Sequence, residues 1–101
     1  MYYLYLLYSV RSDRYYLGIT NNPEARLYSH NHSLRKTYTS KHRPWEMRAL
    51  FEVGEDRSKA VLIERWVKRQ KSRALMERMA NGDELKEGML AQLVRVPRPR
   101  D

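Results

Sequence analysis

Two short apolar segments near the start of the chain constrain the fold more than any other feature. Residues 1–9 (MYYLYLLYS) and 15–20 (YYLGIT) are rich in aromatic and aliphatic side chains, and a polar turn at 11–14 separates them. Such segments favour strands, and their close spacing predicts a β-hairpin. If the connecting loop has an even number of residues, positions whose numbers add to an odd sum lie opposite each other, unless a bulge intervenes.

This pairing gives the hairpin two chemically different faces, because successive side chains in a strand point to opposite sides. One face is aliphatic and requires a hydrophobic core: Leu4, Leu6, Leu17 and Ile19. The other face combines phenol hydroxyls with a glycine: Tyr3, Tyr5, Leu7, Tyr16, Gly18 and Thr20. A glycine in a strand marks either a bulge or a place where a ligand can approach the backbone. The second face is therefore the candidate for function.

The rest of the chain predicts a small α/β (α+β) sandwich with a three-stranded antiparallel sheet flanked by helices. An asparagine cap followed by proline starts a helix at 21–24, a third strand covers 45–53, and an amphipathic helix covers 58–71. Residues 33–45 form a basic loop in which Pro44 opposes helix formation. A helical segment over 72–94 breaks at Asn81-Gly82. The chain thus forms one domain, 1–94, with a motif-bearing part (1–75), a helical part (76–94) and a basic, disordered tail (95–101).

Composition narrows the class of protein. The 101 residues suffice for one domain, and no apolar run reaches the roughly 18 residues of a membrane span. The absence of cysteine excludes disulfides and thiolate catalysis. We therefore expect a cytoplasmic protein without a membrane partner. The net charge of +8 indicates a polyanionic partner such as DNA or RNA.

The positive charge is concentrated in two blocks. Residues 1–45 carry 7 basic and 2 acidic side chains, and residues 57–78 carry 8 basic and 2 acidic ones. The intervening residues 46–56 are acidic, with 1 basic and 4 acidic side chains. A run of basic residues can also be a simple solvated helix face.

Several ordered motifs carry a resemblance to a known family. Tyr3-Leu4-Tyr5 followed by Tyr16-Leu17-Gly18 resembles the paired strand motifs of the GIY-YIG nucleases, although Tyr3, Leu4 and Leu17 depart from the family's residues. The helix segment 22–30 and the glutamate Glu64 stand where that family keeps its next elements. The stretch 39–45 and the run 71–73 are most similar to small stand-alone bacterial members, which resemble the N-terminal nuclease domain of the excinuclease subunit UvrC. The likeness covers about residues 1–75.

The resemblance implies a metal-dependent DNA endonuclease that hydrolyses phosphodiester bonds in repair or recombination. Glu64 would bind one divalent ion, Mg²⁺ or Mn²⁺, with waters completing the shell. Arg26 would pair with the scissile phosphate. Tyr5 and Tyr16 would position or deprotonate the attacking water with help from His30, and which tyrosine is the base stays open. For a phenol to act as a base its pKa must fall, and Arg26 is the nearest cation that could lower it.

Substrate binding is expected from the basic loop and the basic helix, because the chain leaves no room for a separate DNA-binding domain. The candidate residues are Arg35, Lys36, Lys41, Arg43, Lys68, Lys71 and Arg73. DNA is the expected partner, RNA is not excluded, and a protein partner could supply specificity.

Each candidate also has an ordinary structural explanation. The tyrosines could be strand aromatics, Arg26 and His30 a solvated helix face, and Glu64 the partner of Lys68 four residues on. A rival function is nucleic-acid binding without turnover, with tyrosines stacking on bases and arginines holding phosphates. A weaker alternative is a protein-interaction module that uses an exposed Trp45. Neither His32 nor His42 is expected to be catalytic.

Overall fold

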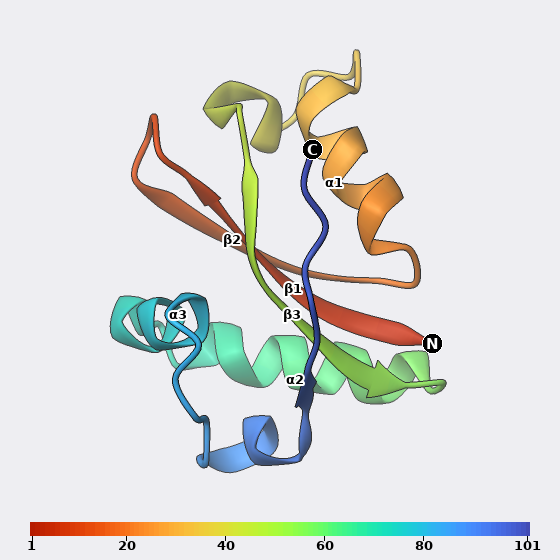
Figure 1. The fold of residues 1–101 in the computed structure, drawn as a ribbon, viewed down its shortest axis with the longest axis vertical. Helices are drawn as coiled ribbons and strands as arrows, with labels where there is room; N and C mark the ends of the chain where they lie inside the picture. Colours follow the sequence, from red (N-terminus) through yellow and green to blue (C-terminus); the bar gives the residue numbers. More distant parts are fainter.

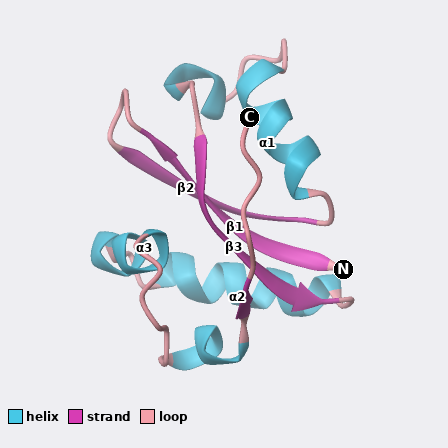
Figure 2. Ribbon diagram, in the orientation of Figure 1, coloured by secondary structure: helices cyan, strands magenta, loops and turns pink.

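The computed structural model describes residues 1–101 as one sheet with helices on both faces (Figures 1 and 2). The strands are β1 (Tyr2–Ser9), β2 (Arg14–Thr20), β3 (Glu46–Gly54) and β4 (Val94–Arg95). The α-helices are α1 (Pro23–His32), α2 (Arg57–Arg69) and α3 (Arg73–Ala80), and two 3₁₀ turns are η1 (Thr39–His42) and η2 (Gly88–Gln92). In Figure 1, α1 lies on one side of the sheet, whereas α2 and α3 lie on the other.

The sheet is antiparallel with the strand order β2-β1-β3-β4. Tyr5 lies opposite Gly18 and Leu6 opposite Leu17, so the predicted hairpin register is confirmed. The prediction of three strands is corrected to four, because Val94 and Arg95 pair with β3. Two residues carry too weak a pattern to be recognised as a strand in the sequence.

Alternation along β1 and β2 divides the core into two clusters. The cluster beneath α2 and α3 is entirely apolar: Leu4, Leu6, Leu17, Ala49, Phe51, Ile63, Val67, Leu75, Met79 and Leu90. The cluster on the α1 side is smaller and contains two aromatic side chains: Tyr5, Leu7, Leu27, Trp45, Met47 and Leu50. The hairpin therefore supplies Leu4, Leu6 and Leu17 to one face and Tyr5 with Leu7 to the other, as its sequence predicts.

Helix α1 begins as its sequence requires. The Asn22 side chain accepts a hydrogen bond from the Ala25 N–H at 3.1 Å, and Pro23 occupies the first turn, where no N–H is needed. The helix buries Leu27 and His30 against the sheet. This start fixes which side chains of α1 face the tyrosines.

The second half of the chain differs from expectation in its details. Helix α2 ends at Arg69, and Lys71 adopts a positive φ of 46° before α3 begins. The predicted break at Asn81-Gly82 is present, because α3 ends at Ala80. The short 3₁₀ turn η2 is the one helical element after α3, so residues 76–94 are less helical than predicted.

The basic loop and its flanking tryptophan also differ from expectation. The η1 turn forms within residues 33–45 immediately before the cis peptide bond between Arg43 and Pro44. The Trp45 side chain is 2 % exposed, and its Nε1–H donates a 2.7 Å hydrogen bond to the Thr39 carbonyl. The alternative that relied on an exposed Trp45 is therefore wrong, because the ring belongs to the core.

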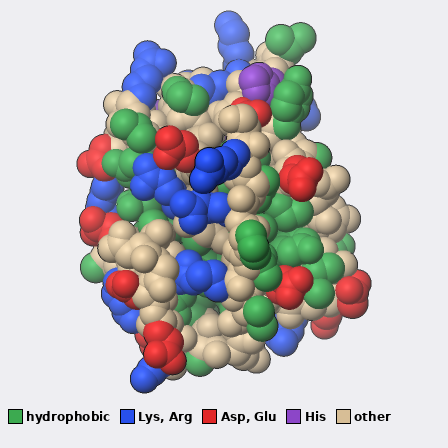
Figure 3. All heavy atoms as spheres, in the orientation of Figure 1, with side chains coloured by type: hydrophobic (Ala, Val, Ile, Leu, Met, Phe, Trp, Pro, Cys, Tyr) green, Lys and Arg blue, Asp and Glu red, His purple; other side chains and the backbone are tan.

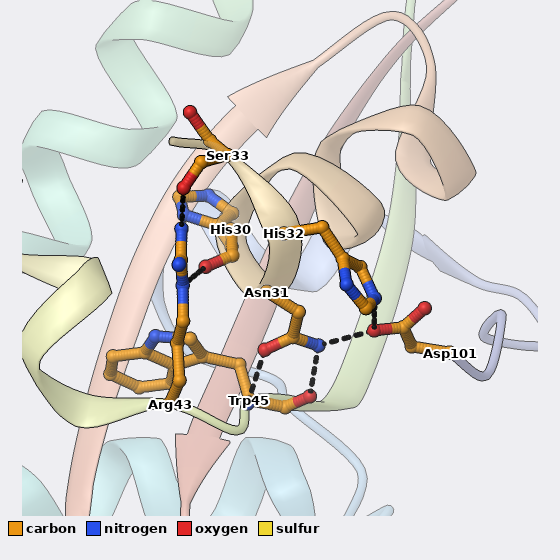
Figure 4. A network of polar contacts seen from close by, with 7 residues as sticks. All are labelled: His30, Asn31, His32, Ser33, Arg43, Trp45 and Asp101. Carbon is orange, nitrogen blue, oxygen red and sulfur yellow. Dashed lines mark hydrogen bonds and ion pairs between the residues drawn. The ribbon is translucent and has the colours of Figure 1, made fainter. Parts of the chain in front are cut away.

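The tail was predicted to be disordered from residue 95, but Arg95 belongs to β4 and the following residues lie across the sheet beside β3 (Figure 1). The Val96 N–H donates to the Leu50 carbonyl at 2.9 Å. The Asp101 carboxylate accepts hydrogen bonds from Asn31 Nδ2 at 2.8 Å and His32 Nε2 at 2.9 Å (Figure 4). The tail thus connects β3 to α1.

None of the helices has the length and apolarity that a membrane crossing requires.

Candidate active site

An open hollow of about 370 Å³ lies beside the edge strand β2, where residues of β1, β2, α1 and α2 meet. It is lined by polar and charged side chains with a few apolar ones: Tyr5, Tyr16, Gly18, Ile19, Arg26, Arg57, Val61, Glu64 and Arg65. Two larger hollows, of about 440 and 500 Å³, adjoin the tail, but neither contains a predicted catalytic residue. Chemistry rather than size therefore identifies the candidate site.

Gly18 makes room for the Tyr5 phenol. A Cβ atom at position 18 would lie 2.5 Å from the Tyr5 hydroxyl oxygen and 2.6 Å from the ring carbon that carries it. Both values are far below ordinary contact distance, and the Tyr5 ring is only 2 % exposed. A glycine at position 18 is therefore needed because the phenol crosses directly over its backbone.

His30 stands behind Tyr5 and connects it to the basic loop. The Tyr5 hydroxyl lies 2.9 Å from His30 Nε2, and His30 Nδ1 lies 3.0 Å from Thr39 Oγ1. His30 does not line the hollow itself, and it is buried. The three side chains form a continuous hydrogen-bonded chain from the hollow to η1.

The surroundings of Tyr5 and His30 keep both side chains neutral. Burial raises the pKa of Tyr5 well above its ordinary value of 10, with further contributions from Tyr16 and Glu64, while Arg26 acts in the opposite direction. The expectation that Arg26 lowers the pKa of this phenol is therefore correct in sign but outweighed by burial. Burial, with the positive charges of Arg26 and Arg43, lowers the pKa of His30 to about 4. At neutral pH the pair is a phenol beside a neutral imidazole.

Tyr16 is the more accessible tyrosine of the site, since its ring is only half-buried. Its ring meets the His30 ring edge-on with 5.1 Å between centroids. It also packs near the rings of Tyr38, at 6.5 Å, and Trp45, at 6.2 Å. Aromatic contacts thus hold Tyr16 beside Tyr5 at the wall of the hollow.

Glu64 is the one carboxylate that lines the hollow. Its side chain is 19 % exposed, and Lys68 Nζ lies 3.4 Å from its Oε2, so the predicted i,i+4 ion pair is present. No group of three or more His, Asp or Glu side chains in the molecule is arranged so that it could hold a metal ion. Any metal bound in the hollow would therefore have Glu64 as its carboxylate ligand and would take its other ligands from water and substrate.

The model of the GIY-YIG catalytic domain matches residues 1–78, which is most of the chain and includes every residue of the hollow. This protein belongs to the GIY-YIG family. No curated protein matches the sequence. The GIY-YIG domain is a nuclease domain, so at the level of the family the protein hydrolyses phosphodiester bonds and its substrate is a nucleic acid.

The basic loop of this GIY-YIG protein places four of the predicted nucleic-acid-binding residues around one depression. They are Arg35, Lys36, Lys41 and Arg43. Arg43 is partly used for structure, because its guanidinium donates to the carbonyls of His30 at 2.6 Å and Ser33 at 2.7 Å (Figure 4). The other three are exposed and free to meet a phosphate backbone.

The three predicted binding residues of the second basic block differ in whether their side chains are already paired within the protein. Lys68 pairs with Glu64, and Arg73 donates to the side chain and carbonyl of Asp13 at 2.5 and 2.9 Å. Lys71 is exposed. Figure 3 shows that Lys and Arg side chains on the face crossed by the tail are mixed with acidic ones rather than forming one basic field.

Three functional candidates of the GIY-YIG domain were missing from the predicted site residues. Arg57 and Arg65 line the hollow with Glu64, and their spacing along α2 would have indicated this, since positions 57, 61, 64 and 65 share one helix face. Thr39 completes the hydrogen-bonded chain behind Tyr5. A threonine in a polar loop gives no such signal in a single sequence. His32 and His42 do not line the hollow; His42 Nδ1 lies 2.9 Å from Ser12 Oγ.

Proposed function

We propose that this GIY-YIG protein is a metal-dependent DNA endonuclease that acts in the cytoplasm in repair or recombination. One observation carries the proposal: residues from four elements, Tyr5, Tyr16, Arg26 and Glu64, line a single hollow. Tyrosines, a guanidinium and a carboxylate are the groups that water activation, phosphate binding and metal binding require.

In this proposal the arginines that line the hollow bind the phosphate. Arg26 approaches from α1, and Arg57 and Arg65 approach from α2. With Glu64 as the one acidic side chain, the lining has an excess of two positive charges. A phosphodiester entering the hollow would be attracted by this excess, and Arg26 beside Tyr5 would stabilise the charge that develops in the transition state.

Tyr5 is the better candidate for the general base because it has a proton acceptor of its own. The Tyr5 hydroxyl is 2.9 Å from His30 Nε2, so its proton can pass to the imidazole as the phenol oxygen takes a proton from the attacking water. At rest this transfer is unfavourable, since the pKa of Tyr5 is raised and that of His30 is lowered. A phosphate bound to Arg26 would offset one of the charges that lower the pKa of His30 and thereby favour the transfer. Tyr16 would then orient the water.

Glu64 fits a divalent cation of the Mg²⁺ or Mn²⁺ type. A single carboxylate in an open hollow suits Mg²⁺, which retains several waters and prefers oxygen ligands. When bound, the ion would act as a Lewis acid toward the phosphate oxygen. Lys68 would remain close enough to balance the carboxylate in the absence of the ion.

A cleavage assay tests this function. Labelled single-stranded, duplex, flapped and branched DNA, with RNA for comparison, is incubated with Mg²⁺ or Mn²⁺ and the parent protein or Glu64→Gln. We expect cleavage by the parent and a loss of at least 100-fold in Glu64→Gln, with DNA binding retained because a negative charge leaves a phosphate site. The matched control is Glu84→Gln, whose carboxylate is exposed and pairs only with Lys86. Equal cleavage by Glu64→Gln and the parent would remove Glu64 from the mechanism, and tight binding without cleavage by the parent would favour the non-catalytic alternative.

A further inference from the structure

The hydrogen-bonded chain behind the hollow continues from His30 to Thr39, to which the function proposed above assigns no step. Its side chain is 6 % exposed, and its Oγ1 lies 3.0 Å from His30 Nδ1. The same oxygen lies 3.2 Å from Thr37 Oγ1. Thr39 thus occupies the position behind the imidazole, on the side opposite Tyr5.

The donors and acceptors of this chain run in one direction if the Tyr5 phenol donates to its one hydrogen-bond partner in the protein, His30 Nε2. The phenol carries its proton at neutral pH, and when it donates that proton to His30, Nε2 is the acceptor. A neutral imidazole has one N–H, which must then sit on Nδ1 and point to Thr39 Oγ1. The Thr39 hydroxyl in turn can donate to Thr37 Oγ1.

Several contacts hold Thr39 in place independently of its hydroxyl. Trp45 Nε1–H donates to the Thr39 carbonyl at 2.7 Å, and the Trp45 ring is buried in the core. Arg43 attaches the same loop to the end of α1 through the carbonyls of His30 and Ser33 (Figure 4). The hydroxyl can therefore be removed while the backbone that presents it stays anchored.

We propose that Thr39 is a positioning residue that holds His30 in the Nδ1–H tautomer, so that Nε2 is free to accept the proton of Tyr5. This inference rests on the proposed function for its catalytic consequence, but the tautomer itself is a property of the resting protein. The other tautomer would present an N–H to the Tyr5 oxygen, and the imidazole could then take no proton from the phenol. Orienting a histidine through its second nitrogen is a general device of catalytic sites.

Two substitutions at position 39 separate the hydroxyl from the shape of the side chain. Thr39→Val keeps the branched shape and removes the acceptor, whereas Thr39→Ser keeps the hydroxyl. Thr37→Val is the matched control, because it makes the same chemical change one step further from the imidazole. Thr39→Ala offers the same loss of acceptor if valine prevents folding.

The first measurement is long-range ¹H–¹⁵N NMR of the imidazoles at neutral pH in the ligand-free protein, with His32 and His42 as internal references. We expect the Nδ1–H tautomer of His30 in the parent, Thr39→Ser and Thr37→Val, and a shift toward the Nε2–H tautomer in Thr39→Val. An Nε2–H tautomer in the parent, or an unchanged Nδ1–H tautomer in Thr39→Val, would overturn the inference. This result is decided whether or not the protein cleaves DNA.

The second measurement is the rate of cleavage of the best substrate. We expect kcat to fall about 10- to 100-fold in Thr39→Val with KM unchanged, and to recover in Thr39→Ser. Full activity of a folded Thr39→Val protein would overturn the positioning role. If the parent cleaves no substrate, the proposed nuclease function fails, while the NMR result still decides whether Thr39 sets the tautomer.

Discussion

The face of the sheet beneath α2 and α3 and the face beneath α1 use the same strands in different ways. Beneath α2 and α3 the buried cluster is aliphatic and aromatic without a polar side chain. Beneath α1 the buried Tyr5 and His30 are joined by a hydrogen bond, and Thr39 continues the chain. No buried polar side-chain atom in the molecule lacks a partner. This difference indicates that the face beneath α2 and α3 contributes mainly to stability, whereas the face beneath α1 carries candidate catalytic residues.

Breaking the apolar face should give the largest effect on stability. Leu6 is fully buried among the side chains beneath α2 and α3, so Leu6→Ala should lower the free energy of unfolding by about 2–5 kcal/mol. Urea denaturation measures the change. Leu62, on the outer side of α2, is 54 % exposed, and Leu62→Ala should cost less than about 1 kcal/mol. Equal losses from both substitutions would contradict the assignment of stability to this face.

Acid should destabilise the protein through His30, a buried residue of the α1 face. The pKa of His30 is lowered to about 4 from an ordinary value of 6.5, so between these pH values the unfolded chain binds a proton that the folded protein does not. The free energy of unfolding should therefore fall as the pH falls from 6.5 to 4, by on the order of 2–3 kcal/mol from this residue.

Denaturation of the parent and His30→Gln across this pH range isolates the contribution, since the carboxylates titrate in both proteins. The variant should be less stable at neutral pH and lose less stability on acidification. Parallel curves would mean that His30 does not titrate abnormally.

Filling the space at Gly18 should damage the α1 face with a smaller loss of stability. A methyl group there would overlap the Tyr5 phenol, so Gly18→Ala should cost about 1–3 kcal/mol and displace the hydroxyl from His30. We expect cleavage to fall more than the remaining folded fraction explains, which parallel denaturation and cleavage measurements would show. Unchanged stability and activity would indicate that Tyr5 has an alternative position.

The smallest expected effects concern exposed lysines on the two sides of the molecule. Lys41 belongs to the depression of the basic loop next to α1, and Lys86 lies in the segment after α3. Lys41→Ala should reduce the dependence of log K on log salt for DNA binding by about 1, because one phosphate contact is lost. Lys86→Ala should leave this slope unchanged. Equal changes would show that binding follows net charge rather than location.

The local parts of the fold were predictable from the sequence. The register of the hairpin follows from alternation, and the start of α1 follows from Asn22 and Pro23. Strand β4, the course of the tail and the burial of Trp45 were not predictable, because each depends on contacts between distant segments, such as Val96 with Leu50. Local patterns do not encode such contacts.

The site was predictable to a different extent. The convergence of Tyr5, Tyr16, Arg26 and Glu64 was anticipated through the family resemblance, since composition alone favoured ordinary strand tyrosines. Thr39 could not have been selected, because only the packing of η1 against α1 brings its hydroxyl to His30. The catalytic roles themselves stay predictions for the experiments above.

The side chain of Asn31 has a consequence for chemical ageing. Its amide forms the two hydrogen bonds to Trp45 that a neighbouring strand would form: Oδ1 accepts from the Trp45 N–H at 2.6 Å, and Nδ2 donates to the Trp45 carbonyl at 3.0 Å (Figure 4). Nδ2 also donates to the Asp101 carboxylate. Deamidation would replace the donor with a carboxylate oxygen facing a carbonyl and a second carboxylate. A change of one atom, with almost no change in mass, would then release the tail and loosen the loop that presents Thr39.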